Sequence, residues 1–225
     1  MIKSTIFEVR DIRERHKNGC KDEDALKCIL LYNPCMEKPF AERTQEKMQE
    51  VLMDPNANGP AIHYYMIRGG KEKLNITVME TGTVGGEYIK TYGHYHVFDF
   101  KETYKIIHGE GLVLLQIRDK DKDGKFIDDS IASFRAIPVG PGDVIEIPSF
   151  AGHLLVNTGD TWLVTSDDSV FDPTGDSSSM PKHADYESVR KMQGFAYYAI
   201  SKNGKPALQK NPRYKSVPKA DIEYK

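Results

Sequence analysis

The sequence contains few cysteines, and all of them lie in its first 35 residues. Cys20, Cys28 and Cys35 are odd in number and lack Cys-x2-Cys spacing, which argues against both a disulfide framework and a structural zinc site. Reduced thiols are the simpler interpretation, and they are typical of the cytoplasm. We therefore expect a cytoplasmic chain that relies on its own hydrophobic core for stability.

The sequence also lacks a long hydrophobic run and an excess of charge of either sign. The longest apolar run, residues 28–32, is too short to span a bilayer, and residues 1–19 have no hydrophobic segment of the kind found in signal peptides. Lys and Arg number 31 against 33 acidic residues, for a net charge of −2, so no basic field is available for nucleic acid or an anionic membrane. We expect a small molecule as the partner, and neither nucleic acid nor membrane.

What is present is the composition of a folded domain rich in short strands. Hydrophobic residues make up 39% of the 225 residues, enough for one sizeable core with extensions. From Ala61 the hydrophobic pattern has a period of two, and turns rich in Gly, Asp and Asn separate the runs. We predict strands at 62–67, 74–79, 88–92, 102–107, 112–118, 133–137, 143–147, 153–156 and 161–165. Such a series indicates an all-β fold, a closed or two-sheet antiparallel barrel.

The two flanks of the predicted barrel differ from it in pattern. Residues 1–60 are interpreted as an N-terminal extension, with a helix that opens at 39–43, carries a stripe of Met48, Val51 and Leu52, and packs over a sheet. The barrel core is placed at residues 61–170. Residues 171–225 are predicted to close over it with a flexible loop, a helix and a hairpin, at 172–179, 185–193 and 195–209 respectively.

The candidate residues for a reactive site are His94 and His96, which stand two apart and so would point to the same face of a strand. Glu102 and His153, from neighbouring strands, could complete a cage of three nitrogens and one oxygen. Such a cage suits Fe, Mn, Ni, Cu or Zn and leaves positions for water or substrate on an octahedral metal. A site for chemistry is therefore indicated.

The spacing of glycine, proline and asparagine around these residues resembles the two sequence motifs of the cupin superfamily. Its members have a double-stranded β-helix or jelly-roll-like barrel that holds one divalent metal. Glu102 stands seven residues before Gly109, five residues separate Gly142 from Pro148, and Asn157 follows His153 by four. The resemblance implies His94, His96, Glu102 and His153 as metal ligands. One departure concerns the loop of five residues between His96 and Glu102, which is longer than usual and contains Asp99 as a rival oxygen ligand. Glu102 is preferred because it keeps its offset to Gly109.

Within that superfamily, the chain resembles the cupin-type phosphoglucose isomerases known chiefly from archaea. The resemblance covers roughly residues 60–215 and is most specific at Thr-Tyr-Gly-His-Tyr-His, residues 91–96, and at Asn-Pro-Arg, residues 211–213. It implies interconversion of glucose 6-phosphate and fructose 6-phosphate, a homodimer, and one Fe²⁺ ion per subunit, with Mn²⁺, Ni²⁺ or Zn²⁺ as substitutes. Where family members often have lysine, this chain has Tyr92.

The resemblance also implies roles for single residues around the metal. The expected substrate-binding residues are Thr77, Thr91, Gly93 and His183, the last only if one residue is inserted before Asp185. Glu102, Tyr104 and Tyr186 are the expected catalytic residues, although buried tyrosines more often serve as walls than as reacting groups.

Several alternatives stay open at this stage. Glu102 could move a proton in an enediol route or only orient substrate in a hydride-shift route. The chain could instead be a different cupin metalloenzyme, such as another sugar-phosphate isomerase or an Fe(II) dioxygenase, or a non-catalytic protein that binds sugar with the help of a metal.

Overall fold

The computed structural model describes residues 40–67, 75–99, 101–169 and 184–224, all of which belong to one compact unit, Pro39–Lys225. Predictions for the three cysteines, for the loop at 172–179 and for His183 lie outside the described residues. Within the described ranges, the helices are all too short or too polar to cross a membrane.

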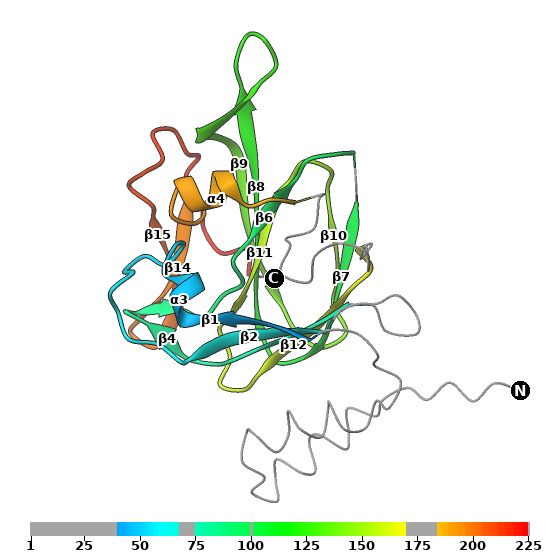
Figure 1. The fold of residues 1–225 in the computed structure, drawn as a ribbon, viewed down its shortest axis with the longest axis vertical. Coiled ribbons are helices and arrows are strands. Elements are labelled where there is room, and N and C mark those ends of the chain that lie inside the picture. Colours follow the sequence, from blue (N-terminus) through cyan, green and yellow to red (C-terminus); the bar gives the residue numbers. More distant parts are fainter. Residues whose placement is uncertain (1–39, 68–74, 100, 170–183, 225) are drawn as a thin grey trace, which may run out of the picture. The chain divides into compact units, whose positions relative to one another are not determined.

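Strands dominate the described chain, and its two helices are short. The elements, labelled in Figure 1, are β1 (Phe40–Thr44), α3 (Gln45–Met48), β2 (Ile62–Ile67), β3 (Asn75–Met79), β4 (Thr83–Val84), β5 (Glu87–Tyr88), β6 (His94–His96), β7 (Glu102–His108), β8 (Gly111–Lys120), β9 (Phe126–Val139), β10 (Val144–Ile147), β11 (Gly152–Asn157), β12 (Leu163–Asp167), β13 (Ala184–Asp185), α4 (Glu187–Lys191), β14 (Tyr197–Lys202) and β15 (Lys205–Lys210).

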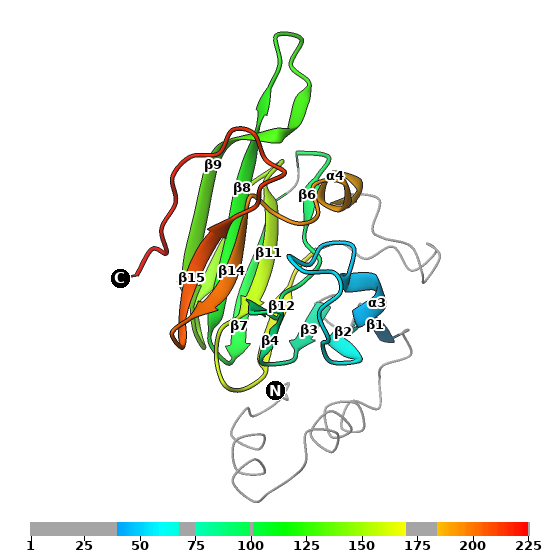
Figure 2. The same ribbon diagram turned by 90° about the vertical axis from the view of Figure 1, so that its left-hand side faces the viewer.

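These strands form two large antiparallel sheets and a smaller one. The six-stranded sheet has the order β1-β2-β3-β12-β7-β10, and the five-stranded sheet has the order β13-β6-β11-β8-β9. The third sheet, β15-β14-β5-β4, contains the predicted C-terminal hairpin with its turn at Asn203-Gly204. Figure 2 shows β8, β9 and β11 running side by side, with the strands of the other large sheet behind them. The prediction of an all-β fold built from two antiparallel sheets is confirmed.

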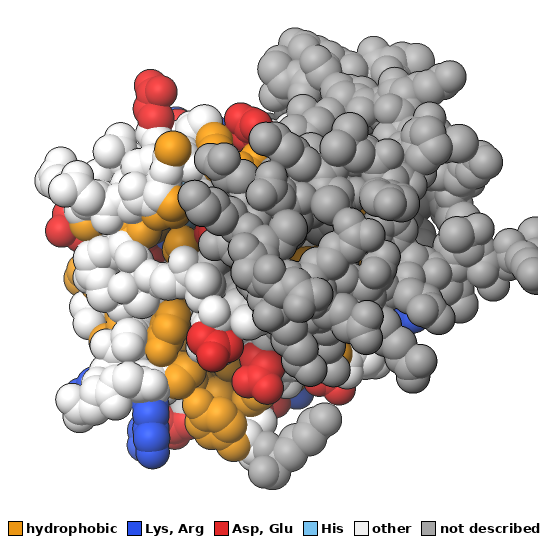
Figure 3. Space-filling model, turned by 90° about the horizontal axis from the view of Figure 1, so that it is seen from below, with side chains coloured by type: hydrophobic (Ala, Val, Ile, Leu, Met, Phe, Trp, Pro, Cys, Tyr) orange, Lys and Arg blue, Asp and Glu red, His pale blue; other side chains and the backbone are white. Residues whose placement is uncertain are grey.

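The core lies between the two large sheets. Ile106 on β7 and Leu114 on β8, from different sheets, belong to one buried hydrophobic cluster. Large hydrophobic side chains of the described residues that stay exposed are Val97, Phe98, Val144 and Tyr224. Figure 3 shows one face, on which hydrophobic side chains lie among acidic ones.

The predicted start of the N-terminal helix at 39–43 is wrong, because Phe40–Thr44 forms strand β1. It pairs with β2 from Phe40↔Ile67 to Thr44↔Ile62, and pairing with a distant strand satisfies backbone groups that a local helix would otherwise satisfy. The helix begins only at Gln45, where Thr44 Oγ1 accepts a hydrogen bond from the Lys47 backbone N–H at 3.2 Å. The predicted apolar stripe of Met48, Val51 and Leu52 is fully buried.

Candidate metal centre and its pocket

Three histidines converge because two neighbouring strands carry them on the same face. His94 and His96 are the first and last residues of β6, so their side chains share a face. His153 on β11 lies directly opposite His94 in the antiparallel register. The ring centroid of His153 is 4.3 Å from that of His94 and 4.8 Å from that of His96. The geometry that the period of two predicted is present.

Glu102 reaches this cluster from the other large sheet, as the first residue of β7. Its Oε2 lies 3.1 Å from His96 Nε2 and 3.2 Å from His153 Nε2, and the residue is 3% exposed. Burial by itself raises the pKa of this carboxyl, but the polar contacts with His153 and His96 outweigh it and hold the pKa well below its usual range. The carboxylate is therefore ionised at neutral pH.

The donor atoms of His94, His96, Glu102 and His153 fit a single metal ion. They all lie within 4.8 Å of one another. Metal–nitrogen and metal–oxygen bonds of about 2.1 Å place adjacent octahedral donors roughly 3 Å apart, close to the two separations from Glu102 Oε2. Both ring nitrogens of His153 are buried: Nε2 faces Glu102 Oε2, and Nδ1 has no hydrogen-bond partner in the described part of the chain. Buried nitrogens of this kind are suited to a ligand.

Asp99, the rival oxygen ligand, lies elsewhere. Its Oδ1 accepts a hydrogen bond from Ser149 Oγ at 2.6 Å in an exposed position, and it is not among the grouped donor atoms. In the longer loop between His96 and Glu102, Val97 and Phe98 are 40% and 60% exposed.

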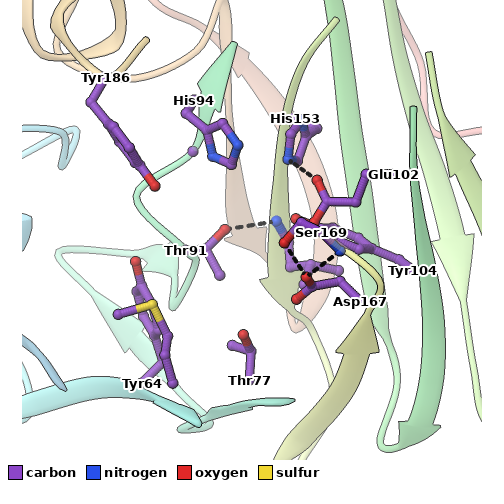
Figure 4. A pocket seen from close by; sticks show the side chains of 13 residues that line it. Tyr64, Thr77, Thr91, His94, Glu102, Tyr104, His153, Asp167, Ser169 and Tyr186 are labelled. Atoms are coloured by element: carbon purple, nitrogen blue, oxygen red, sulfur yellow. Dashed lines mark hydrogen bonds and ion pairs between the residues drawn. The ribbon is translucent and has the colours of Figure 1, made fainter. Parts of the chain in front are cut away.

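A pocket of about 480 Å³, counting the space at its open mouth, adjoins the metal-ligand cluster. Figure 4 shows His94, His153 and Glu102 at one end and the hydroxyl-bearing side chains of Tyr64 and Thr77 at the other. The predicted residues that line it are Thr77, Thr91, Gly93, His94, Glu102, Tyr104, His153 and Tyr186. Every sequence-predicted site residue that the structure describes therefore lines the pocket except His96, which belongs to the metal-ligand cluster and contacts Glu102.

Two hydroxyls of the pocket have their acceptor side occupied by backbone N–H groups. Thr91 Oγ1 accepts from the Leu155 N–H at 3.0 Å, and Tyr64 Oη accepts from the Tyr92 N–H at 3.1 Å. Each hydroxyl retains its own proton as a donor, and both side chains line the pocket. Tyr64 escaped sequence reasoning because it sits in an ordinary period-of-two strand with no motif around it.

Sequence reasoning also missed a buried polar group that consists of Asp167 on β12 and Ser169 just after this strand. Asp167 Oδ1 accepts from Asn75 Nδ2 at 2.7 Å and from Ser169 Oγ at 2.5 Å, and Asn75 also donates to Ser169 Oγ at 2.9 Å. Asp167 and Ser169 both line the pocket. An acidic residue at the end of a buried strand is the signal that could have drawn attention to it.

The tyrosines of the site take different positions. The ring of Tyr104 meets His153 edge-on at 5.5 Å, and the ring of Tyr186 lies 5.0 Å from His94. Tyr92, which stands where family members often have lysine, is not a lining residue. Its hydroxyl donates to Glu50 Oε2 at 2.5 Å, so the residue faces away from the pocket.

Comparison with known proteins adds a family to this geometry. The family model described as glucose-6-phosphate isomerase (GPI) matches residues 43–216. A glucose-6-phosphate isomerase of Thermococcus onnurineus is 31% identical over 87% of this chain and 81% of its own length. That of Thermococcus kodakarensis is 32% identical over 86% of this chain and 80% of its own length. The match to the Pyrococcus abyssi enzyme, 32% identical, spans 62% of this chain and 63% of that protein.

Solved structures give a weaker likeness. A predicted oxalate decarboxylase from Thermotoga maritima is similar over 59% of this chain and 92% of its own, with a TM-score of 0.35 and 18% identity. The capsular polysaccharide assembling protein CapF of Staphylococcus aureus has a TM-score of 0.34 and 17% identity over 67% of this chain and 35% of its own.

Proposed function

The chain belongs to the glucose-6-phosphate isomerase family, and we propose that it interconverts glucose 6-phosphate and fructose 6-phosphate with the help of one bound divalent metal. The observation that carries the proposal is the convergence of His94, His96, Glu102 and His153 beside a pocket lined with hydroxyls. This combination offers one end for the reacting carbonyl carbons and another for the rest of a sugar phosphate.

The four clustered side chains would hold the ion, which when bound acts as a Lewis acid toward the oxygens on C1 and C2 of the sugar. We propose Fe²⁺ as the resident metal, by family resemblance, and Mn²⁺, Ni²⁺ or Zn²⁺ as ions that the same imidazole and carboxylate donors also accept.

Glu102 is the residue positioned to handle the proton. Isomerisation moves a hydrogen between C1 and C2, and the buried, ionised carboxylate of Glu102 can accept the proton from C2 and return it to C1 in an enediol route. In a hydride-shift route, Glu102 would only orient the substrate. Incorporation of solvent deuterium at C1 or C2 during turnover would favour the enediol route, and its absence the hydride shift.

The opposite end of the pocket is suited to the phosphate without a strongly basic protein. The hydroxyls of Thr91 and Tyr64 can each donate a hydrogen bond, since backbone N–H groups occupy their acceptor side. Thr77 lines the same end in Figure 4. Gly93 also lines the pocket and has no side chain, and its backbone N–H is a further candidate donor. We propose that these groups bind the phosphate oxygens.

A different sugar phosphate with the same reaction is the second candidate. Asp167 places a carboxylate in the pocket lining beside Ser169, and carboxylates accept hydrogen bonds from sugar hydroxyls. Comparing kcat/KM for fructose 6-phosphate and for other ketose and aldose phosphates would decide between the two. By family resemblance, we also propose a cytoplasmic homodimer.

The test is a coupled assay of fructose 6-phosphate conversion, before and after removal of metal by a chelator and reconstitution with Fe²⁺ or Mn²⁺. Glu102→Gln keeps the shape of the side chain and should lower kcat at least about 100-fold. Glu146→Gln is the matched control, since Glu146 is exposed and paired with Lys101, and should keep full activity. Metal-loaded protein that binds the sugar without turning it over would refute the proposal.

A further inference from the structure

Tyr186 reaches the site from a segment that has little structure of its own. The segment consists of the two-residue strand β13 and the five-residue helix α4, with Tyr186 between them. β13 pairs with β6 through Ala184↔His96 and Asp185↔Tyr95 alone. A helix this short is not stable by itself, so other contacts must fix the place of the tyrosine ring over His94.

The side chain of Arg118 supplies such contacts from strand β8. Its Nη1 donates to Ser188 Oγ at 2.7 Å and to Asp185 Oδ2 at 3.3 Å. Asp185 directly precedes Tyr186, and Ser188 follows it by two residues. The same Nη1 also lies 2.9 Å from Asp128 Oδ1 on β9. One guanidinium therefore joins the β8–β9 hairpin to residues on both sides of Tyr186.

Arg118 is held where it can do this by packing as well as by charge. Its guanidinium carbon lies 3.9 Å from the centroid of the Tyr95 ring and 4.8 Å from that of Phe126, and the residue is 7% exposed. A guanidinium packs against two aromatic rings more extensively than an ammonium group does. Tyr95 lies between the ligands His94 and His96, so the cation rests on the strand that carries them.

Asp185 connects the arginine to the start of the helix. Its Oδ1 accepts the backbone N–H of Ser188 at 3.1 Å, and its Oδ2 accepts Ser188 Oγ at 2.7 Å. Without Arg118, the carboxylates of Asp185 and Asp128 would face each other with less compensation, since Lys191 contacts only Asp128. Like charges in a partly buried place repel strongly.

We propose that Arg118 is a positioning residue that orders the segment 184–191 and thereby sets Tyr186 over His94. This inference rests on the proposed function in one respect only, namely that Tyr186 takes part in turnover.

The first test compares Arg118→Met with Tyr186→Phe and with the double variant. Each single change should lower kcat about tenfold, and the double variant should also be lowered about tenfold instead of about 100-fold, because both changes remove the same contribution. Arg118→Lys, which keeps the charge but loses the fork, should recover part of the loss. Unchanged kcat in Arg118→Met, or independent losses in the double variant, would overturn the proposal.

The second test needs no turnover and therefore separates this inference from the proposed function. Hydrogen exchange should be followed at the amides of Arg190, Met192 and Gly194, which donate to Tyr186, Ser188 and Val189 within the segment. In Arg118→Met their exchange should rise at least about tenfold while β11 stays protected.

Arg135→Met is the matched control for that exchange experiment. Arg135 on β9 forms an exposed ion pair with Glu223, so its loss should leave exchange in segment 184–191 unchanged. Unchanged exchange in Arg118→Met as well would refute the positioning role even if the chain proves to be an active isomerase. If the chain shows no isomerase activity, the proposed function fails while the exchange result still decides this one.

Discussion

Gly93 stands directly before His94 in a conformation with a φ of 78°. A Cβ atom there would lie 3.0 Å from Phe195 Cε1, 3.1 Å from Leu154 Cβ and 3.2 Å from the His153 carbonyl oxygen. Both the backbone angle and the lack of space therefore require glycine, and any relief would move the ligand strands. A residue that sequence motifs mark as substrate-binding has a structural reason as well.

Gly93→Ala should lower the free energy of unfolding by about 2–3 kcal/mol, from the left-handed φ and from the crowding together. It should also weaken metal binding about tenfold by displacing His94. Denaturant unfolding and metal titration measure the two effects. Gly124→Ala is the control, because Gly124 has a φ of 80° with open space around it and so reports the cost of the backbone angle alone. Equal losses in both variants would contradict the steric argument.

At the scale of elements, the segment that follows β1 is fastened to the barrel by buried polar groups. His63 on β2 is fully buried and contacts Gln45 Oε1 through its Nε2 at 2.5 Å. Gln45 Nε2 donates to the Ala57 carbonyl at 2.9 Å, which fixes the amide orientation and makes His63 Nε2 the donor. Lys90 donates to the Val51 carbonyl at 2.7 Å. The buried Nδ1 of His63, which would carry a second proton, has no hydrogen-bond partner among the described residues, so docking of this segment requires a neutral His63.

This requirement makes stability depend on pH. Burial and the nearby Lys90 charge lower the pKa of His63 to about 4, whereas in the unfolded chain it is about 6.5. Since the unfolded state binds the proton first, the contribution is complete above pH 6.5 and is lost as the pH falls toward 4. Between pH 7 and pH 5, wild type should lose about 2 kcal/mol more stability than His63→Met, as measured by urea unfolding. Parallel losses in the two proteins would show that other groups cause the pH dependence.

What the sequence could predict at this scale depends on how local the determining forces are. The C-terminal hairpin followed from Asn203-Gly204, and β7 and β11 followed from alternation bounded by turn residues, because these signals act within a few residues. β1 could not be predicted, since Phe40–Thr44 becomes a strand only by pairing with β2. The predicted helix at 185–193 is shorter, Glu187–Lys191, because β13 takes its first residue.

The candidate site shows the same division. The period of two brought His94 and His96 to one face, and the offset to Gly109 favoured Glu102 over Asp99, as the structure has them. Tyr64 and Asp167 could not be found in this way. Their place in the pocket depends on which strands lie next to one another, and no motif encodes that.

At the scale of the whole molecule, β9 is the edge strand of its sheet, and an unpaired strand edge can template association between molecules. The C-terminal residues cover it. Ser216 bridges to Ser130 and Ile222 bridges to Ala136, both in parallel, and Glu223 forms a two-pronged ion pair with Arg135 at 2.9 and 2.7 Å. These C-terminal residues are therefore part of the fold and protect the edge of β9.

A chain truncated after Lys215 should form assemblies larger than those of the full-length chain and should melt several degrees lower, as measured by light scattering and calorimetry. Glu223→Gln is the control, because it removes only an exposed ion pair, worth about 0–1 kcal/mol, and leaves the backbone bridges in place. A truncated chain of unchanged assembly size would show that the β9 edge is protected in another way.

The loop between His96 and Glu102 offers a place for redesign. Its two ends are fixed, since His96 pairs with Ala184 and Glu102 with Ile147, while Val97 and Phe98 between them are exposed. Although this loop is longer than usual, the donor atoms of His94, His96, Glu102 and His153 still form one group. The length and composition of this loop can therefore be varied in a search for new sugar preferences, while the strands that carry the four candidate ligands are kept unchanged.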